Sequence, residues 1–538
     1  MLRIAVIAGN GNPLALKLAE ELRRQRPAIP CDCLSALSPD SPFFENCVYV
    51  PSYCRNGMAP DLTRAETVFQ QSAQVRIKRF VVLSSALIYG TGPGRQSLVG
   101  EGSATAGNLD APVPSQWMLL EALAFRYLED RVKLTILRPV TVLPSPALLS
   151  RRLLRNLALT LPGHDPVIQL LGLADLAQAV VCALEHDREG IFNVAPDGVV
   201  PLYAAIRMSG GHRIAVPRTL QKLAARSETL EYLRYPWTVS NRKIKRELGF
   251  QPQKSSVAVL QELRRPSSPV ASAEPAFDEF GMDRRKIESY GRTLFKFLSR
   301  WYWRIEIKGL EHLLREGPAI LVGTHRGFMP WDGVMALHAA LRATGRVPRF
   351  LTHPGLFKFP FISTWTRRLG GVLACQESAD RILENGELLG VFPEGVHGAF
   401  SLYRHAYVLK SFGRDSFVKL ALSHRAPIIP FVTVGSAEIL PIFMRIKSRR
   451  WTRYSDWPCI PVSTFPFLPV PLPSKWHTQF LPPIHLDQRY GPDSARNPSV
   501  AKAISRDVRS RMQQAVDDIL RRRRSIFFGS VFRPEDVS

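Results

Sequence analysis

The sequence is poor in cysteine, in long apolar runs and in acidic residues. Only seven of its 538 residues are cysteines, and the pair Cys31 and Cys33 has no second pair at zinc-binding spacing. We therefore expect neither a disulfide framework nor a metal site, which favours a reducing compartment. No run of about 18 apolar residues occurs, so we expect no membrane-spanning helix. The apolar run at 3–8 is too short for a signal peptide, which predicts a cytoplasmic protein.

The shortage of acidic residues leaves a strongly basic chain. Lysine and arginine number 71 against 46 aspartates and glutamates, which gives a net charge of +25. Residues 281–538 hold 39 basic and 21 acidic side chains, a surplus of 18. Such a surface attracts nucleic acid, anionic lipid or phosphorylated substrates. Because no nucleic-acid-binding motif accompanies the charge, we expect no nucleic-acid partner.

Length and composition predict a globular chain with more than one domain. At about 100–200 residues per domain, the chain is too long for one ordinary core. Residues 263–284 contain prolines among small polar residues, a composition typical of a linker. We therefore predict one domain over residues 1–262, a linker over 263–284 and a second domain over 285–538.

The N-terminal segment combines a predicted strand, a glycine turn and a predicted helix. Residues 3–8 have the pattern of a buried strand, Gly9 and Gly11 follow, and residues 14–23 have the apolar periodicity of a helix. This arrangement places amide N–H groups where a dinucleotide pyrophosphate could bind. The same pattern also forms a tight turn in any α/β domain.

Further segments of the first domain resemble the extended short-chain dehydrogenase/reductase (epimerase-like) family. The segments that carry the resemblance are 79–90, 134–139, 172–179, 190–194 and 247–252. The resemblance implies a Rossmann-type, doubly wound parallel sheet. It also implies a cofactor site at Gly9 and Gly11, with Ser85 at the position of the family's catalytic serine.

The family's catalytic tyrosine and lysine are replaced in this chain. Val113 and Trp117 occupy their positions, and no phenol is therefore available for proton transfer. We expect a domain without redox or epimerase activity, in which NAD(P) binding stays undecided. An active NAD(P)-dependent epimerase or reductase is the alternative.

The second domain contains a histidine and an aspartate around a predicted strand–helix junction. Residues 319–324 have the pattern of a buried strand, His325 follows it, and Asp332 falls in the first turn of a helix that begins near Pro330. In one interpretation the two form a dyad, in which Asp332 orients the imidazole and His325 accepts a proton from an attacking hydroxyl. In the other, they are a polar loop histidine and a helix-capping aspartate.

Two downstream motifs favour the dyad. Phe392-Pro-Glu-Gly395 and the proline-flanked strand 426–435, in this order after His325 and Asp332, resemble the glycerolipid acyltransferase family. The resemblance implies transfer of a fatty acyl group from acyl-CoA or acyl carrier protein to a hydroxyl of a glycerolipid such as a lysophospholipid. It requires no cofactor or metal, and it implies that Glu394 and Gly395 shape the acceptor pocket.

The chain departs from this family at two positions. Six residues separate His325 from Asp332 where four are common, and Gln376 stands where the family has an arginine for the acceptor phosphate. Arg404 and Lys410 are other candidates for binding the acceptor, or they belong to the solvated surface.

Three segments suit a membrane surface. Segment 291–303 intersperses aromatic and basic residues, 445–453 is a basic cluster that includes Trp451, and 464–473 is apolar but broken by prolines. Cations beside aromatics at a lipid boundary predict peripheral contact with the cytoplasmic face of a membrane. A buried aromatic helix with basic edges is the alternative for 291–303. For the whole chain, the rival is a lipid- or nucleotide-binding regulatory protein without transferase activity.

Overall fold

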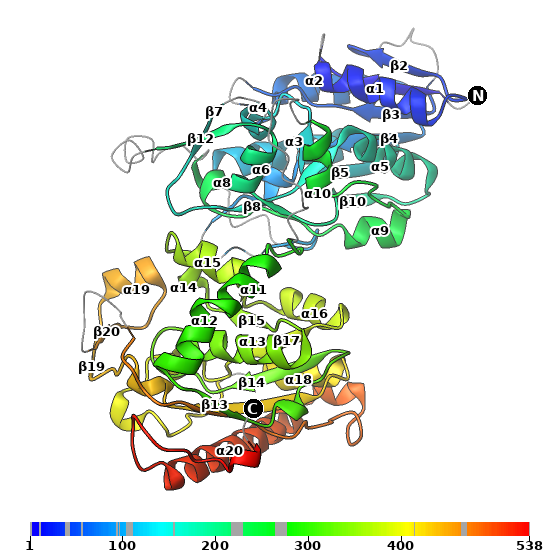
Figure 1. The fold of residues 1–538 in the computed structure, drawn as a ribbon. Helices are drawn as coiled ribbons and strands as arrows, with labels where there is room; N and C mark the ends of the chain where they lie inside the picture. Colours follow the sequence, from blue (N-terminus) through cyan, green and yellow to red (C-terminus); the bar gives the residue numbers. More distant parts are fainter. Residues whose placement is uncertain are drawn as a thin grey trace. The chain divides into compact units, whose positions relative to one another are not determined.

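The computed structural model describes most of the chain, and the described residues divide into two compact units. The described ranges are 3–9, 12–37, 44–54, 57–92, 95, 97–103, 111–153, 157–216, 230–263, 277–413, 415–463 and 471–536. The units are Met1–Gly281 and Met282–Ser538 (Figure 1). Residues 264–276, most of the predicted linker, lie outside the described residues, so the linker stays a prediction.

The first unit is built on a six-stranded parallel sheet of order β10-β5-β4-β3-β1-β2. Its strands are β1 (Ile4–Ile7), β2 (Cys31–Leu34), β3 (Asn46–Tyr49), β4 (Arg79–Leu83), β5 (Lys133–Pro139) and β10 (Gly190–Val194). Most of these strands are buried on both faces, which explains their nearly continuous apolar sequences. Helices cover both faces of the sheet.

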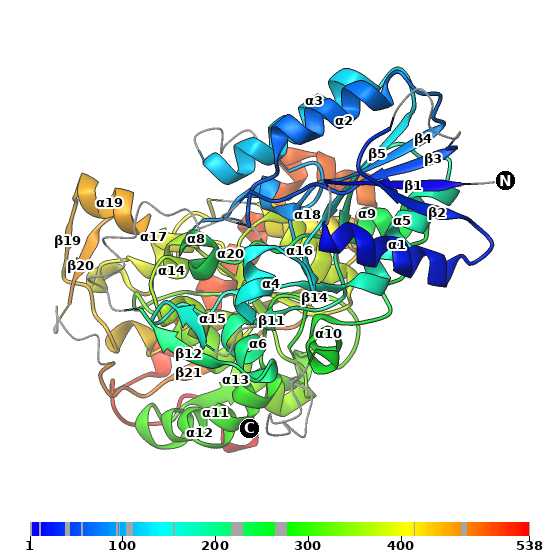
Figure 2. The same cartoon turned by 90° about the horizontal axis from the view of Figure 1, so that it is seen from above.

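The helices of the first unit form two layers. Figure 2 shows α2 (Leu62–Ser72) and α3 (Pro112–Leu128) on one face of the sheet, and α1 (Pro13–Gln25) and α5 (Leu173–Glu185) on the other. This arrangement confirms the predicted Rossmann-type, doubly wound sheet. Counted consecutively, the strand order is 2-1-3-4-5-6. Within the described residues, one strand fewer therefore lies beyond β1 than in the 3-2-1-4-5-6 order of dinucleotide-binding sheets.

Smaller elements complete the first unit. Three two-stranded pairs are β6 (Thr141–Leu143) with β9 (Leu170–Gly172), β7 (Leu157–Thr160) with β12 (His212–Ala215), and β8 (Val167–Ile168) with β11 (Val200–Pro201). The short helices are α4 (Leu148–Leu153), α6 (Leu202–Met208), α8 (Glu231–Arg234), α9 (Arg242–Leu248) and α10 (Ser256–Glu262).

The second unit has its own seven-stranded sheet of order β13-β21-β18-β14-β17-β15-β16. Its strands are β13 (Glu306–Lys308), β14 (Ala319–Gly323), β15 (Arg349–Thr352), β16 (Val372–Leu373), β17 (Leu388–Val391), β18 (Ile428–Val434) and β21 (His477–Phe480). All neighbours run parallel except β18 and β21. The central strand β14 therefore has parallel neighbours on both sides, and its carboxyl end meets theirs at one edge of the sheet.

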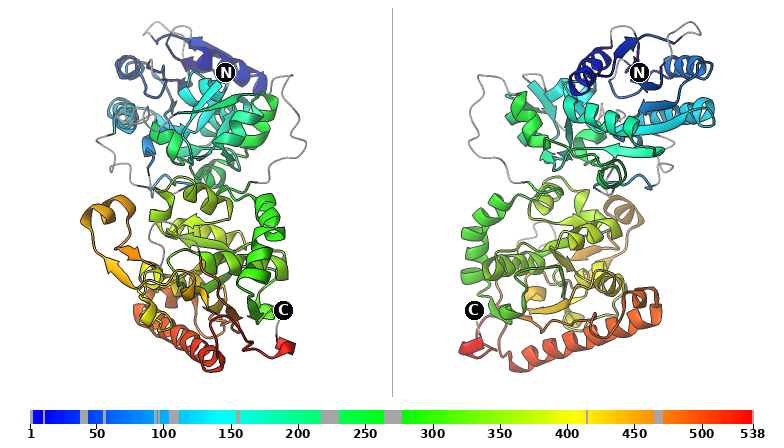
Figure 3. Two further views of the ribbon diagram at one scale, coloured as in Figure 1. Left: turned by 60° about the vertical axis from the view of Figure 1, so that its left-hand side comes forward. Right: turned by 90° about the vertical axis from the view of Figure 1, so that its right-hand side faces the viewer.

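Helices pack around this sheet, and one arm projects from it. The helices are α11 (Arg284–Arg292), α12 (Leu294–Phe297), the π-helix η4 (Leu298–Tyr302), α13 (Trp331–Thr344), α14 (Pro354–Phe357), α15 (Ile362–Arg368), α16 (Gln376–Glu384), α17 (Gly395–Ala399), α18 (Ser416–Ser423) and α20 (Pro498–Arg522). The arm, residues 443–462, consists of β19 (Met444–Ile446), α19 (Arg449–Ser455) and β20 (Ile460–Val462) (Figure 3, orange). In the described part of the chain, no helix is long and apolar enough to cross a bilayer.

Candidate active site

The register of two parallel strands brings the histidine and the glutamate motifs together. Val322 of β14 lies opposite Val391 of β17. Both chains leave the sheet at the same edge, so His325 and Glu394 each follow this matched pair by three residues. The central strand therefore places the two motifs side by side, although they are distant in the sequence.

The loop after β14 reverses direction before α13 begins. Gly327 has φ +84° and Phe328 has φ +59°, so two consecutive residues adopt the left-handed conformation. A Cβ atom at position 327 would lie 2.4 Å from the Ser436 carbonyl oxygen, and only glycine fits there. The ring of Phe328 packs edge-on against Phe400 and Trp457, with ring centroids 5.3 and 5.0 Å apart. The two extra loop residues are thus accommodated by a close backbone contact and an aromatic cluster.

His325 and Asp332 are in hydrogen-bonding contact. His325 Nδ1 lies 3.0 Å from both carboxylate oxygens of Asp332. The backbone N–H groups of Arg326 and Gly333 donate to the same carboxylate, each at 2.9 Å. The Asp332 side chain is fully buried, whereas that of His325 keeps 13% of its surface exposed. The aspartate is therefore held rigidly beneath an imidazole that solvent and substrate can reach.

A second buried ion pair supports this loop, and sequence reasoning missed it. The Arg326 guanidinium donates to both Glu394 oxygens, from Nη1 at 2.6 Å and from Nη2 at 3.0 Å. Its Nη1 also donates to the His325 carbonyl oxygen at 2.8 Å, and its Nε donates to the Ala406 carbonyl oxygen. Both side chains are almost fully buried. An arginine directly after a buried strand is the signal that could have revealed the pair, because a buried guanidinium needs an acidic partner.

Glu394, for which a place in the acceptor pocket stays a prediction, has protein partners of its own. Its carboxylate accepts hydrogen bonds from Arg326 and from the backbone N–H of Lys410, the latter at 2.8 Å, so it holds the His325 loop in position. Gly395 has φ +54°, and a Cβ atom there would meet no atom within 4 Å. The glycine is therefore explained by backbone conformation.

Of the other candidate acceptor residues, Lys410 lies beside this pair, since its backbone N–H donates to Glu394. Lys410 Nζ donates to the His397 carbonyl oxygen at 2.8 Å. Partial burial, helped by the nearby charges of Arg445 and Arg326, lowers the pKa of Lys410. Arg404 is exposed. Gln376 donates its side-chain amide to Asp380 at 3.1 and 3.2 Å, so this amide has a local partner at the start of α16.

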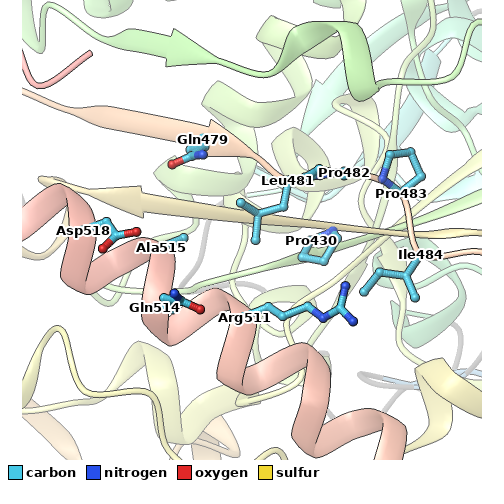
Figure 4. A pocket seen from close by; sticks show the side chains of 10 residues that line it. All are labelled: Pro430, Gln479, Leu481, Pro482, Pro483, Ile484, Arg511, Gln514, Ala515 and Asp518. Carbon is cyan, nitrogen blue, oxygen red and sulfur yellow. The ribbon is translucent and has the colours of Figure 1, made fainter. Parts of the chain in front are cut away.

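One hollow of the second unit lies apart from the dyad. It has a volume of about 280 Å³ and is bounded by the ends of β18 and β21 and by α20, with Pro430, Arg511 and Asp518 in its wall (Figure 4). Its lining contains neither His325 nor Asp332.

In the first unit, the side chain of Asn12 caps the N-terminus of α1. Asn12 Oδ1 accepts hydrogen bonds from the backbone N–H groups of Leu14 and Ala15, at 3.0 and 3.3 Å. Pro13 has no N–H to donate. A Cβ atom at Gly9 would lie 2.6 Å from Ser52 Oγ, which explains the glycine by a close contact. Gly11 lies outside the described residues.

The three residues that the resemblance aligns with catalytic residues of the epimerase-like family, Ser85, Val113 and Trp117, are buried. Ser85 Oγ accepts from the Leu87 backbone N–H at 3.2 Å and caps a 3₁₀ turn. Val113 is buried. The Trp117 indole is fully buried, packs edge-on against Tyr53 and donates to the Met58 carbonyl oxygen at 2.8 Å. The residue that the resemblance aligns with the family's lysine is thus a large, buried and hydrogen-bonded ring.

Beside it lies a buried polar network that joins α3, β5, β10 and the segment after β4. Arg138 donates to both oxygens of Glu121, at 2.8 and 2.6 Å, and to the Tyr89 hydroxyl at 2.7 Å. Ser84 donates to Glu121 at 2.6 Å, and Tyr89 donates to Asn193 at 2.8 Å. Burial raises the pKa of the Tyr89 phenol, and the neighbouring Arg138 only partly offsets this rise. Each of these charges has a partner within the network.

Comparison with known proteins identifies an Acyltransferase domain within the second unit. A family model described as Acyltransferase matches residues 304–434, which include His325, Arg326, Asp332 and Glu394. The protein named DGAT1/2-independent enzyme synthesizing storage lipids, from Bos taurus, is 27% identical over 186 residues, which are 34% of this chain and 53% of that protein. The model match and this relative support acyltransferase activity.

Two further similarities concern family and fold. A short-chain dehydrogenase/reductase superfamily protein from Agrobacterium tumefaciens, solved with bound NAD, has a TM-score of 0.37 and 14% identity, over 48% of this chain and 95% of that one. Uncharacterized protein Rv0502 of Mycobacterium tuberculosis is 37% identical over 262 residues, which are 47% of this chain and 72% of that protein. The chain therefore belongs to the family of this mycobacterial protein, and its residues 304–434 form an Acyltransferase domain.

Proposed function

We propose that the second unit transfers a fatty acyl group from an acyl thioester to a hydroxyl of a glycerolipid, with His325 as the general base. The observation that carries the proposal is the 3.0 Å contact between His325 Nδ1 and Asp332 inside a matched Acyltransferase domain. The name of the bovine relative, which describes the synthesis of storage lipids, supports a glycerolipid as the acceptor.

The geometry favours a simple proton transfer. With the Nδ1 proton donated to Asp332, the other ring nitrogen, Nε2, presents its lone pair for the acceptor hydroxyl. As the hydroxyl oxygen attacks the thioester carbonyl carbon, its proton moves to Nε2, and the buried carboxylate stabilises the imidazolium. The C–S bond then breaks, and the thiolate leaves with the proton from Nε2. The products are the acyl ester and the free thiol of coenzyme A or of acyl carrier protein.

The oxyanion of this reaction needs donors other than the Arg326 amide. That amide already donates to Asp332 at 2.9 Å. We expect other backbone N–H groups of the loop to stabilise the tetrahedral intermediate, as preorganised donors do in acyl transfer.

The test is an acceptor panel for the full-length protein. Labelled acyl-CoA or acyl-loaded acyl carrier protein is mixed with lysophospholipids and with mono- and diacylglycerols, and labelled lipid products are separated. We expect transfer to at least one glycerolipid. If the folded protein transfers label to none of them but binds lipid vesicles, the lipid-binding alternative replaces the enzyme.

We also propose peripheral contact with a membrane, made by the arm of residues 443–462. Its exposed apolar side chains include Phe443, Met444 and Ile446, with 57%, 53% and 45% of their surfaces accessible. Exposed cations alternate with them, namely Arg445, Lys447, Arg449, Arg450 and Arg453. Trp457 of the arm packs against Phe328 of the loop between β14 and α13, residues 324–330, which we call the catalytic loop, so a lipid bound by the arm would lie close to the dyad.

The arm predicts a specific change in membrane affinity. Co-sedimentation of the full chain with vesicles that contain phosphatidylglycerol should weaken in Met444→Ser/Ile446→Ser, because two exposed apolar anchors are lost. The matched control is Leu157→Ser/Leu159→Ser, which changes two leucines of similar exposure in β7. Equal weakening by both pairs, or none by either, would rule out the arm as the contact.

For the first unit we propose a structural or regulatory role without NAD(P). The residues present do not fit the cofactor. The cap at Asn12 satisfies the α1 amides that a pyrophosphate would use, and Trp117 replaces the lysine. No step of the proposed reaction depends on this unit.

Titration of NADH and NADPH into the full chain checks this role. We expect no saturable change in cofactor fluorescence at concentrations up to about a millimolar, because a competing internal cap must first be broken. Saturable binding in the micromolar range would show that the first unit senses a nucleotide.

A further inference from the structure

A basic pocket on the second unit lies outside the proposed acyl-transfer chemistry. It has a volume of about 640 Å³, within the range of small-molecule sites, and it lies where α11, α12 and η4 meet α13. Its charged lining residues are Glu288, Arg292, Lys296, Arg300 and Arg342. We call it the α11–α13 pocket.

In the part of the chain that the structure describes, the cations of this pocket have no acidic partner. Glu288, the acidic residue of the lining, pairs with Arg284 at 3.0 Å. Within the described ranges, none of the four cations makes an ion pair, although Arg300 lies over the Trp301 ring. Four unpaired positive charges around one concavity repel one another, and a bound anion would relieve that repulsion.

His338 provides a second, independent indication of a ligand. It lines the pocket, and only 5% of its surface is exposed. Among the described residues, neither of its ring nitrogens has a hydrogen-bond partner. A buried imidazole without a partner is costly, so a ligand that accepts its N–H would stabilise the site.

The surroundings of His338 explain both its position and its protonation. Gly291 of α11 lies beside the ring, where a Cβ atom would make an ordinary contact at 3.5 Å from its Nδ1, and Phe295 packs against the ring edge-on. Burial, with a smaller contribution from Arg342, lowers the pKa of His338 to about 4. At neutral pH the ring is therefore neutral, with one N–H donor and one acceptor, while the cations around it supply the charge.

We propose that the α11–α13 pocket binds a phosphate ester, held by its four cations and by the buried His338. Guanidinium and ammonium groups are the side chains best suited to phosphate oxygens. The volume exceeds the need of a bare phosphate and leaves space for the group that the phosphate carries. His338 lies six residues after Asp332 on α13, about 9 Å along the helix, so the pocket is separate from the dyad.

The ester can come from a soluble metabolite or from a lipid headgroup. Phe297 and Trp301, which alternate with the pocket cations in the sequence, have 52% and 66% of their surfaces exposed. Exposed aromatics beside a phosphate site suit a headgroup at a bilayer surface. The pocket and the arm of residues 443–462 involve different residues, so their contributions to membrane binding can be measured separately.

The experiment compares two pairs of substitutions with the same change in charge. Arg292→Gln/Lys296→Gln removes two pocket cations, and Lys502→Gln/Arg522→Gln removes two exposed cations of α20. The full chain and both variants are titrated with inorganic pyrophosphate by calorimetry. They are also sedimented with phosphatidylcholine vesicles, with and without phosphatidic acid. Thermal unfolding of each variant checks that the fold is retained.

We expect the pocket pair to weaken binding of at least one probe about tenfold or more, because each lost cation removes charge-assisted hydrogen bonds. The α20 pair should change it by less than about twofold. A loss confined to phosphatidic acid identifies a lipid headgroup, a loss confined to pyrophosphate identifies a soluble phosphate compound, and a loss for both identifies a phosphate site open to either source. If neither probe binds the wild-type chain, or if both pairs weaken binding equally, the pocket is not a phosphate site. His325→Ala should bind as the wild type does, whether or not acyl transfer is found.

Discussion

Replacing His325 with alanine is expected to lower the rate of acyl transfer by about 10²- to 10⁴-fold, the usual contribution of a general base. The imidazole is the side chain at this site that has both an exposed edge and a buried carboxylate partner. Without it, the acceptor hydroxyl must lose its proton to water. The initial rate of labelled lipid formation, measured on the acceptor that the panel identifies, tests this expectation.

The control for this substitution is His485→Ala. His485 is an exposed histidine of the same unit, outside the catalytic loop, and its removal should leave the rate unchanged. Both variants should remain folded, because Asp332 keeps the backbone N–H donors of Arg326 and Gly333 when the imidazole is removed, and thermal unfolding checks this. Retention of the His325→Ala rate within a factor of about ten would contradict general-base catalysis by this residue.

Much of the fold could be predicted from the sequence because the pattern that predicts each strand, turn or helix lies within a short stretch of residues. The strand, turn and helix of residues 3–25 follow from an apolar run, glycine and helical periodicity. The cap at Asn12 could also have been predicted, since asparagine followed by proline is typical of a helix start. Such a prediction would have indicated that the first backbone N–H groups of α1 donate to the Asn12 side chain.

The part that could not be predicted depends on which strands become neighbours. The sequence places His325 after one strand and Glu394 after another, but only the pairing of β14 with β17 brings them together. The same holds for Trp117, whose replacement of a lysine is visible in the sequence. Its packing on Tyr53 and its hydrogen bond to Met58 exist only in the folded unit.

Segment 291–303 illustrates a mixed outcome. Its alternation of aromatics and cations predicts a membrane-surface segment or a buried aromatic helix, and the structure interrupts the helix at Thr293, which has φ −115° and ψ −92°. Phe295 turns into the core, whereas Phe297 and Trp301 stay exposed. The buried position of Phe295 agrees with the buried-helix alternative, and membrane contact by the exposed Phe297 and Trp301 stays a prediction.

The second large effect is expected from the buried pair beneath the catalytic loop. Glu394→Gln preserves the shape of the side chain but leaves the Arg326 guanidinium buried without a counter-charge, which costs about 3–5 kcal/mol of unfolding free energy. The Arg326 contact to the His325 carbonyl oxygen should loosen at the same time. We therefore expect activity to fall together with the denaturant midpoint of the second unit.

A double-mutant cycle separates the pair from the rest of the loop. Because Arg326→Met/Glu394→Gln removes the orphaned charge, it should be less destabilised than the sum of the two single variants. Asp507→Asn, which breaks the exposed Arg511–Asp507 pair, serves as the control and should cost less than about 1 kcal/mol. Strictly additive losses would show that Arg326 and Glu394 act independently. The double variant can also be more stable than the sum of the single variants predicts while its activity stays low. This result would show that the ion pair also holds His325 in place, because methionine can fill the space of Arg326 but cannot donate to the His325 carbonyl oxygen.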